Sequence, residues 1–191
     1  MTVSRQEIKR EIRKSMKKLE EDFLSHGDLR GESEAIWRQV EESEEFRNAS
    51  TVLLYMAIPG EVPTREFIDK WSGRKRIVIP KVNGEELDLY EYDPSRLQEG
   101  YKGIQEPSED AKKVCPEEID LALVPGVAFT REGGRLGRGK GFYDRLLPHL
   151  KCPCAGVGFS FRWIDEIPSD PWDVSLQSGY GSMCESFSPR K

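Results

Sequence analysis

A strand, a glycine-rich loop and a helix follow one another in DLALVPGVAFTREGGRLGRGKGFYDRLLPHL, residues 120–150. The apolar run 120–126 has the length of a buried strand, and 141–150 has the pattern of a helix. Residues 124–144, which join them, contain six glycines and four basic side chains. In a parallel α/β fold such a connection lies at the carboxyl edge of the sheet, where ligands bind. The stretch therefore predicts an anion-binding loop at that edge.

The composition of this loop suits phosphate, although the loop matches neither common nucleotide-binding template. Glycine lets the backbone approach a ligand closely, and Arg135, Arg138 and Lys140 would neutralise its charge. The spacing of GRLGRGK, residues 134–140, satisfies a P-loop, but Gly141 stands where Ser or Thr should bind the metal. A dinucleotide fingerprint also fails, because its third glycine is missing. We therefore expect a phosphate-binding loop of another kind.

The sequence leaves open whether this loop is a binding site and which residue would bind a metal there. The start of the following helix would present free N–H groups to a phosphate. A nucleotide bound with Mg²⁺ would need another hard oxygen ligand, for which Asp144 is the nearest candidate. The alternative is a flexible surface loop whose positive charge is incidental.

Strand and helix patterns alternate through the rest of the chain, which predicts a largely parallel sheet with helices on its faces. The pair Asn83-Gly84 predicts a tight turn between two strands. We expect a surface loop over 93–118 and a disordered Ser- and Gly-rich tail over 178–191. The expected strands are 51–56, 76–81, 87–92 and 154–159, and the expected helices are 5–24, one beginning near the N-cap Ser33, and a short one from Thr64 through Trp71.

The helix expected over 5–24 has one apolar face and a strongly basic remainder. Apolar residues recur at three- and four-residue steps from Ile8 to Phe23, which is the pattern of an amphipathic helix. Lys9 and Arg13 are four residues apart and are therefore neighbours on one side of the helix. This side is a second candidate for contact with an anion.

The size and charge of the chain narrow the class of protein. The 191 residues, of which 37% are hydrophobic, suit one globular domain spanning 1–191. A net charge of −5 argues against a general nucleic-acid or membrane-surface binder. Residues 1–18 hold seven Lys or Arg against two Glu, so they carry +5 and the rest carries −10. A basic segment on an acidic body favours an anionic ligand.

Other chemistries find little support in the sequence. The start of the chain lacks the apolar stretch of a signal peptide, and no run reaches the length of a membrane span, so we expect a cytosolic protein with four cysteine thiols. Cys152 and Cys154 near His149 would make a poor zinc site. Neither of the two histidines sits in a motif that supplies a nucleophile and an orienting acid.

The segments DLALVPGVAF and RLGRGKGFYD, residues 120–129 and 135–144, resemble the signature of the 5-formyltetrahydrofolate cyclo-ligase family, also called methenyltetrahydrofolate synthetases. The resemblance covers residues 9 to about 177 and implies a three-layer α/β/α single domain with a mostly parallel central sheet. Further blocks in the family's order are KREIR (9–13), Arg30 with Ser33 and Ile36, YMAIPGEVPT (55–64), IVIPK (77–81) and IPSDPWDVSL (167–176).

The resemblance implies an ATP- and Mg²⁺-dependent conversion of 5-formyltetrahydrofolate into 5,10-methenyltetrahydrofolate, with release of ADP and phosphate. In this reaction the γ-phosphoryl group of ATP is transferred to the formyl oxygen, the nitrogen at position 10 attacks the activated carbon, and phosphate leaves. Such chemistry depends on positioning and charge stabilisation more than on a protein nucleophile. From the resemblance we expect a protein that binds 5-formyltetrahydrofolate and ATP. We also expect a cytoplasmic monomer with no nucleic-acid or membrane partner.

Roles for individual residues also follow from the resemblance. Arg138 and Lys140 would stabilise the transferring phosphoryl group. Asp144 and Asp173 match the family's Mg²⁺ ligands, and Glu61 would accept hydrogen bonds from the pterin ring. The residues expected to bind ATP are Lys9, Arg10, Arg13, Arg135, Leu136, Gly137, Arg138, Gly139, Lys140, Gly141, Phe142 and Tyr143. Those expected to bind the folate substrate are Met56, Glu61, Arg138, Gly139, Lys140, Gly141 and Phe142.

Three positions depart from the pattern of the family. Arg162 stands where many members have Gln, Trp172 where His is frequent, and Gln177 where an acidic residue is found. These changes bear on the shape of the pocket and on the surroundings of the metal. Both expected metal ligands, Asp144 and Asp173, are present.

Simpler roles compete with these assignments. Met56 also suits a hydrophobic core, Glu61 an exposed turn, and the row of Lys9 and Arg13 a solvated helix face. For the whole protein, the alternative to an enzyme is a non-catalytic nucleotide- or folate-binding module of the same fold. A third possibility, an RNA binder that uses the basic helix, is opposed by the charge of −10 on the remaining chain.

Overall fold

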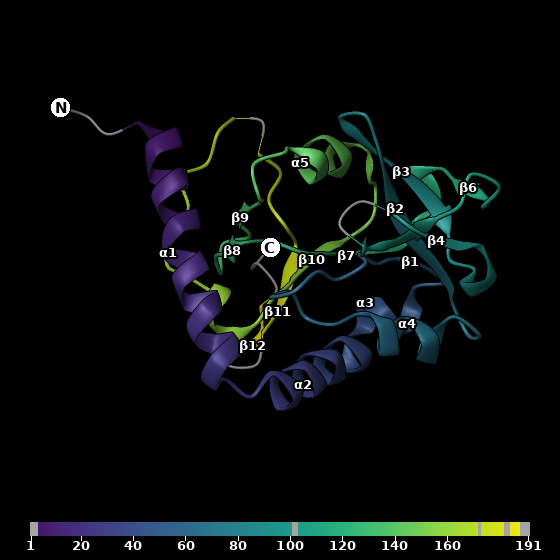
Figure 1. The fold of residues 1–191 in the computed structure, drawn as a ribbon, viewed down its shortest axis with the longest axis horizontal. Helices are drawn as coiled ribbons and strands as arrows, with labels where there is room; N and C mark the ends of the chain where they lie inside the picture. The colour runs from purple at the N-terminus through teal and green to yellow at the C-terminus, as the bar shows by residue number, and fades with distance from the viewer. Residues whose placement is uncertain (1–3, 101–102, 172, 182–183, 188–191) are drawn as a thin grey trace.

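The computed structural model describes residues 4–100, 103–171, 173–181 and 184–187, and an eight-stranded sheet lies at its centre (Figure 1). The strands lie in the order β12-β11-β10-β7-β1-β2-β3-β6. Their bounds are β1 (Thr51–Leu53), β2 (Arg76–Asn83), β3 (Glu86–Glu91), β6 (Lys113–Val114), β7 (Leu121–Val124), β10 (Cys154–Val157), β11 (Ser178–Gly181) and β12 (Cys184–Phe187).

The five strands at the centre of the sheet are parallel. β1 pairs in parallel with β2 and β7, and β10 pairs in parallel with β7 and β11. β12 at one edge and β3 and β6 at the other are antiparallel. The expected mostly parallel sheet is therefore confirmed. The β2–β3 hairpin turns through Gly84 and Glu85, one residue later than expected, and Gly84 has a φ of 61° that suits glycine.

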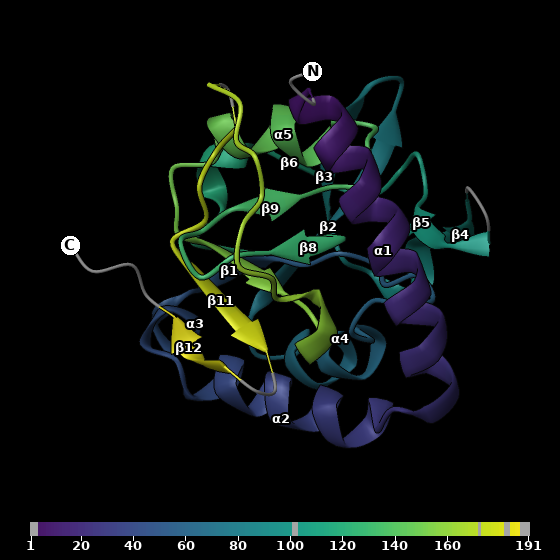
Figure 2. The same ribbon diagram turned by 90° about the vertical axis from the view of Figure 1, so that its left-hand side faces the viewer.

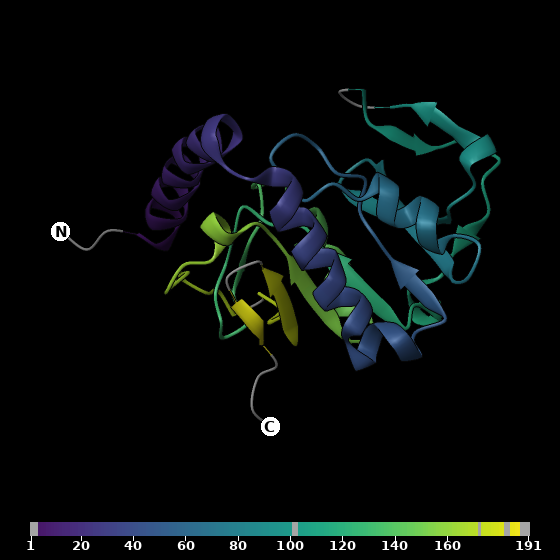
Figure 3. The same ribbon diagram turned by 90° about the horizontal axis from the view of Figure 1, so that it is seen from below.

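Helices cover both faces of the sheet, which confirms the expected three layers. α2, α3 and α4 lie on one face, and α5 lies on the other (Figure 1). Viewed from below, α2 crosses in front of the strands (Figure 3). The bounds of these elements are α2 (Leu29–Glu42), α3 (Glu44–Asn48), α4 (Arg65–Trp71), α5 (Phe142–Leu146) and η4, a 3₁₀ turn that continues α5 (Leu147–His149).

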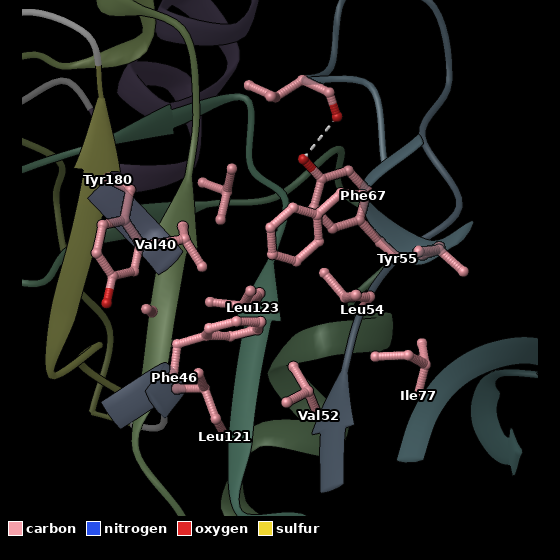
Figure 4. Packing of buried hydrophobic residues seen from close by; sticks show 14 of the residues in the cluster. Val40, Phe46, Val52, Leu54, Tyr55, Phe67, Ile77, Leu121, Leu123 and Tyr180 are labelled. Carbon is pink, nitrogen blue, oxygen red and sulfur yellow. Dashed lines mark hydrogen bonds between the residues drawn. The ribbon is translucent and has the colours of Figure 1, made fainter. Parts of the chain in front are cut away.

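Two hydrophobic clusters fill the spaces between the layers. Val52 and Leu54 pack on the α2 side of the sheet, whereas Leu53 packs on the α5 side, because successive strand residues point to opposite faces. In the first cluster the Tyr55 hydroxyl donates a hydrogen bond of 2.9 Å to the carbonyl of Val62 (Figure 4). The loop that follows β1 is thus tied to the core at its beginning.

The basic helix α1 (Arg5–His26) lies at one end of the sheet, beside a small hairpin of β8 (Ala128–Phe129) and β9 (Arg135–Leu136) (Figure 2). Met16 of α1 packs with Ala128 and Leu136 of the hairpin. The predicted amphipathic helix is confirmed, and it ends two residues later than expected. Among the described residues no helix is both long and apolar enough to cross a membrane.

One predicted helix start is wrong, and the other is confirmed in position but lacks the expected capping bond. α2 begins at Leu29, because the Asp28 side chain accepts a hydrogen bond from the backbone N–H of Gly31 and caps the helix. Ser33 lies within this helix and donates its hydroxyl to the carbonyl of Leu29. Thr64 precedes α4 but makes no capping bond, since its side-chain oxygen accepts from the N–H of Ala57 instead.

The stretch 93–118, expected to be a surface loop, contains regular structure in its described residues. β4 (Leu97–Glu99) pairs with β5 (Gln105–Pro107), and β6 joins the edge of the main sheet. Two 3₁₀ turns, η1 (Pro94–Arg96) and η3 (Pro116–Glu118), also lie in this stretch. The loop prediction was wrong because backbone pairing satisfies the N–H and C=O groups of polar segments without an apolar run.

The tail expected to be disordered provides two strands of the main sheet, β11 and β12, with residues 182–183 and 188–191 outside the described part of the chain. β11 is buried and pairs with β10. A Cβ atom on Gly179 or Gly181 would collide with the Trp163 ring. The glycines of this segment permit a close approach rather than disorder, which corrects the prediction over 178–181 and 184–187.

Candidate functional site

A cavity of about 380 Å³ lies at the carboxyl ends of β1 and β7, where the strand-to-helix connection predicted a ligand site. Tyr55 and Met56 follow β1, and Pro125 and Gly126 follow β7. The glycine-rich loop closes another side of the cavity. The other lining residues are Ile58, Glu61, Pro80, Val82, Leu87, Ile104, Glu106, Arg135, Gly137, Arg138, Lys140, Gly141, Phe142, Tyr143 and Asp144.

The walls of the cavity divide into an apolar part and a charged part. Side chains such as Ile58, Val82 and Leu87 form a surface that suits a flat ring. Arg138 and Lys140 of the glycine-rich loop are exposed cations at the cavity, and they suit an anion. The cavity can therefore receive a ligand that combines a ring system with negatively charged groups.

Arg138 contacts Glu61 across the cavity, although 77 residues separate them. Its Nε and one terminal nitrogen donate to Glu61 Oε1 at 3.3 and 3.2 Å. The other carboxylate oxygen accepts from the N–H of Ile58 at 3.2 Å. The Glu61 side chain is only 9% exposed, so it is not the exposed turn residue of the simpler interpretation. Burial raises the pKa of Glu61, and the positive charge of Arg138 opposes this effect.

Met56 has both of the roles that the sequence left open. It packs against the first hydrophobic cluster and also lines the cavity. A thioether side chain adapts its shape to a partner at little cost, which suits a position between core and ligand.

Arg13 joins the basic helix to the glycine-rich loop. Its Nε donates a hydrogen bond of 2.9 Å to the carbonyl of Gly137. A Cβ atom on Gly139 would lie 3.8 Å from the Arg13 guanidinium, and Gly139 has a φ of 95°. Arg10, in contrast, is exposed. Arg13 therefore joins the basic helix to this part of the glycine-rich loop by a direct hydrogen bond.

Lys9 is buried and paired, which excludes a solvated helix face for this residue. Its Nζ donates to Asp170 Oδ2 at 2.7 Å and to Asp173 Oδ2 at 2.8 Å. Burial alone would lower the pKa of Lys9, but the hydrogen bonds to the two carboxylates raise it above the ordinary value. Lys9 thus holds one of the two expected metal ligands and does not line the cavity.

Arg135 lies within the glycine-rich loop and contacts residues near both of its ends. It donates to the carbonyl of Pro125 and to Asp144 Oδ1, both at 2.9 Å, and its guanidinium lies 5.0 Å from the centre of the Tyr143 ring. Burial lowers the pKa of Arg135, whereas Asp144 opposes that shift. Leu136 points instead into the contact with α1. Positioning is the role that these contacts support for Arg135.

The two expected metal ligands lie in different surroundings. Asp144 lines the cavity, whereas Asp173 accepts hydrogen bonds from Lys9 and from the backbone N–H of Asp170. In the described part of the chain no cluster of three or more His, Cys, Asp or Glu residues could hold a metal ion. Any metal here would need further ligands beyond these side chains. Trp172, one of the departures, lies outside the described residues.

Two residues that matter to this region carry no sequence signal of their own. Asp170 is the partner of Lys9, from which 161 residues separate it. Glu20 of α1 contacts Arg162, whose side chain is 1% exposed. Arg162 stood out only as a departure from the family pattern.

Gln177, the third departure, joins β10 to the segment before β11 by accepting from the N–H of Cys154.

Comparison with known proteins gives consistent matches. The profile described as "5-formyltetrahydrofolate cyclo-ligase family" matches residues 5–178. The chain is 33% identical over 137 residues to the 5-formyltetrahydrofolate cyclo-ligase of Escherichia coli K12, covering 67% of this chain and 75% of that protein. The 5-formyltetrahydrofolate cyclo-ligase of Mycoplasma pneumoniae is 46% identical over 130 residues, which cover 66% of this chain and 69% of that protein.

A solved structure supports the same relationship. The NMR structure of Aquifex aeolicus 5,10-methenyltetrahydrofolate synthetase superposes with a TM-score of 0.84 at 34% sequence identity. The match covers 96% of this chain and 94% of the other. The similarity therefore extends over nearly the whole fold, including the segments that line the cavity.

Proposed function

Because the chain belongs to the 5-formyltetrahydrofolate cyclo-ligase family, we propose that it converts 5-formyltetrahydrofolate and ATP into 5,10-methenyltetrahydrofolate, ADP and phosphate. The observation that carries this proposal is the cavity in which Arg138 of the glycine-rich loop contacts the buried Glu61. Two segments with the chemistry for two different substrates thus meet at one place. ATP is the phosphoryl donor and the folate is the acceptor.

The phosphate groups of ATP bind along the glycine-rich loop in this proposal. Arg138 and Lys140 are exposed at the cavity, and Arg13 lies against the same loop. Fixed cations stabilise the charge on a transferring phosphoryl group without reorganisation during the reaction. Lys9 and Arg10 belong to the same basic helix, but the contacts of Lys9 with Asp170 and Asp173 favour a supporting role for it.

The folate ring binds against the apolar wall, with Met56 beside it and Glu61 at its polar edge. Glu61 is buried, and a carboxylate in such a place can accept hydrogen bonds from the N–H groups of a pterin. Glu61 Oε1 also accepts hydrogen bonds from Arg138, so in this proposal the folate and phosphate subsites are adjacent. This arrangement would bring the formyl oxygen near the γ-phosphate.

The reaction then needs no covalent protein intermediate. The formyl oxygen forms a bond to the γ-phosphorus as the bond to the ADP oxygen breaks, and the nitrogen at position 10 attacks the activated carbon, after which phosphate departs. Among the described residues that line the cavity, those with a hydroxyl group are Tyr55 and Tyr143, and burial raises the pKa of both. Both are therefore neutral and weak nucleophiles, which favours direct transfer between the substrates.

Magnesium fits the donor chemistry of this site. Asp144 supplies a hard carboxylate oxygen at the cavity, and Asp173 is the second candidate ligand once Lys9 releases it. Bound Mg²⁺ would supply positive charge to the phosphate groups of ATP. Substrate oxygens would complete its coordination.

The proposal is tested by incubating the purified protein with 5-formyltetrahydrofolate, ATP and Mg²⁺, and by following methenyl absorbance together with ADP release. Lys140→Ala should lower kcat about a hundredfold or more, because a cation that faces the transferring group is lost. Lys151→Ala removes an exposed lysine that does not line the cavity, and it is the matched control. Ligand binding without turnover would instead identify a non-catalytic module.

We further propose that the chain works as a monomeric single domain in the cytoplasm, without a nucleic-acid or membrane partner. The net charge of −5 supports the absence of such partners, because it repels nucleic acid and anionic lipid. Size-exclusion chromatography with light scattering should give the mass of one chain. A dimer mass, or salt-sensitive binding to RNA, would contradict it.

A further inference from the structure

Arg162 is a buried cation at the junction of three segments. It ends the 3₁₀ turn η5 (Ser160–Arg162), and its side chain is 1% exposed. One terminal nitrogen donates to the carbonyl of Val127 at 3.0 Å. The other donates to Glu20 Oε2 at 2.7 Å and to the carbonyl of Gly60 at 2.6 Å. A guanidinium in the protein interior requires such partners, because burying an unpaired charge is costly.

The turn that Arg162 contacts is the one that presents Glu61. Its backbone is closed by a hydrogen bond of 3.0 Å from the N–H of Glu61 to the carbonyl of Ile58. Pro59 occupies the second position of the turn, and Gly60, with a φ of 85°, occupies the third, as in a type II turn. The carbonyl that accepts from Arg162 therefore belongs to the residue directly before Glu61.

Glu20 brings the basic helix into the same junction. Its carboxylate compensates the charge of Arg162, and a Cβ atom on Gly60 would collide with the Glu20 side chain. Helix α1, which also carries Arg13, is thus packed closely on the turn. The pair of Glu20 and Arg162 connects the helix to the turn within the interior of the molecule.

The third partner of Arg162 leads to the glycine-rich loop. Val127 immediately precedes β8, and its N–H donates a 2.7 Å hydrogen bond to the carbonyl of Leu136 in β9. This hairpin ends where the loop with Arg138 begins. A single guanidinium therefore joins the turn of Glu61, the basic helix that carries Arg13 and the hairpin that leads to Arg138.

We infer that Arg162, together with Glu20, is a positioning pair that holds Glu61 in place relative to α1 and the glycine-rich loop, and so sets the affinity for the folate substrate. The pair acts through the Gly60 carbonyl and does not touch the substrate. The expected effect on folate affinity rests on the proposed function. The expected effect on amide hydrogen exchange in the turn does not depend on that function.

The first test measures backbone protection at the turn in the protein without ligands. Arg162→Met removes all three polar contacts and keeps much of the side-chain volume. Amide exchange in the segment 55–64 should become about tenfold faster, because the turn loses its bond to the interior. Glu20→Gln keeps the hydrogen-bond acceptor but removes its charge, and it should show a smaller change in the same segment. Unchanged exchange at 55–64 in both variants would overturn the inference.

The second test measures the separate kinetic constants for the two substrates. In Arg162→Met the KM for 5-formyltetrahydrofolate should rise about tenfold, with a smaller change in the KM for ATP, because a displaced Glu61 weakens the folate contact first. Arg162→Lys keeps the charge and should restore part of the loss. If Arg162→Met fails to fold, Glu20→Gln and Arg162→Lys provide the same comparison.

The matched control is Arg76→Met, which removes a guanidinium with two carboxylate partners, Glu91 and Glu118, at the start of β2 away from the cavity. It should lower stability without changing either KM. A variant of Arg162 that behaves like this control, with lower stability and an unaltered KM for folate, would refute the positioning role. Absence of turnover in the wild-type protein would refute the proposed function alone, since the exchange result would still decide the inference.

Discussion

Replacing Lys9 by Met should destabilise the protein far more than the same change at Lys14, although both lysines lie on α1 and both are ion-paired. The Lys9 side chain is 9% exposed, and its Nζ lies within 2.8 Å of both Asp170 and Asp173. Lys14 is 69% exposed, and its Nζ lies 4.0 Å from Glu11 Oε2. Burial, and not the presence of a partner, separates the two sites.

The expected magnitude follows from that difference. Removing one partner of a buried pair costs about 3–5 kcal/mol, because the remaining charge is uncompensated. Asp173 is partly exposed, so we take the lower end, about 3 kcal/mol for Lys9→Met. In a chain of this size each kcal/mol lowers Tm by about 2–4 °C, so Tm should fall by about 6–12 °C. An exposed pair contributes below about 1 kcal/mol, so Lys14→Met should stay within about 3 °C.

The assay is thermal unfolding at neutral pH without ligands, so that it reports the ion pairs and not a phosphate contact. The pKa of Lys9 is raised in the folded state, so its contribution is fully present below the ordinary lysine pKa of 10.5. That contribution is lost as the pH rises through the raised value, and the gap between wild type and Lys9→Met should therefore narrow there. Equal Tm values for Lys9→Met and Lys14→Met at neutral pH would refute the reasoning.

Three further predictions concern the cavity and its supports. Glu61→Gln should lower turnover at least about tenfold, which steady-state kinetics would measure. Its stability at pH 7 should be equal or higher in urea unfolding, because burial raises the pKa of Glu61 and ionisation above the ordinary pKa therefore costs folding free energy. Gly60→Ala should lose about 2 kcal/mol in urea unfolding, since its φ of 85° disfavours any Cβ, and an unchanged midpoint would exclude this strain. Asp144→Asn should raise the Mg²⁺ concentration needed for half-maximal turnover, with titration of the metal as the measurement, and an identical titration curve would reject Asp144 as a ligand.

Local chemistry made much of the fold predictable. The apolar runs around Val52, Ile79 and Leu123 form strands, because such short runs suit buried positions in a parallel sheet. The glycine-rich loop lies at the carboxyl edge of that sheet, as the order of strand, loop and helix predicted. The candidate site was predictable to the extent that its residues belong to this loop or to the segment after β1.

Prediction failed where the deciding contact left no pattern of its own in the sequence, whether the partner is distant or near along the chain. The glycines of 178–181 looked like a disordered tail, but they admit the Trp163 ring next to a buried strand. Ser33 was the expected N-cap, but the helix begins earlier, at Leu29, and Asp28 is its N-cap. In each case the sequence pattern was compatible with more than one structure, and a contact made in the folded chain selected one of them.

The sequence by itself determined the strand and helix alternation, the glycine-rich and basic character of the loop and the family of the protein, because these depend on residues close together along the chain. The tertiary structure alone decided what the charged side chains do. Lys9, expected to meet phosphate, is buried against Asp170 and Asp173, and Arg162 connects α1 to the turn of Glu61. Charge is visible in a sequence, but its partner and its burial, which set its energy, exist only once the chain has folded.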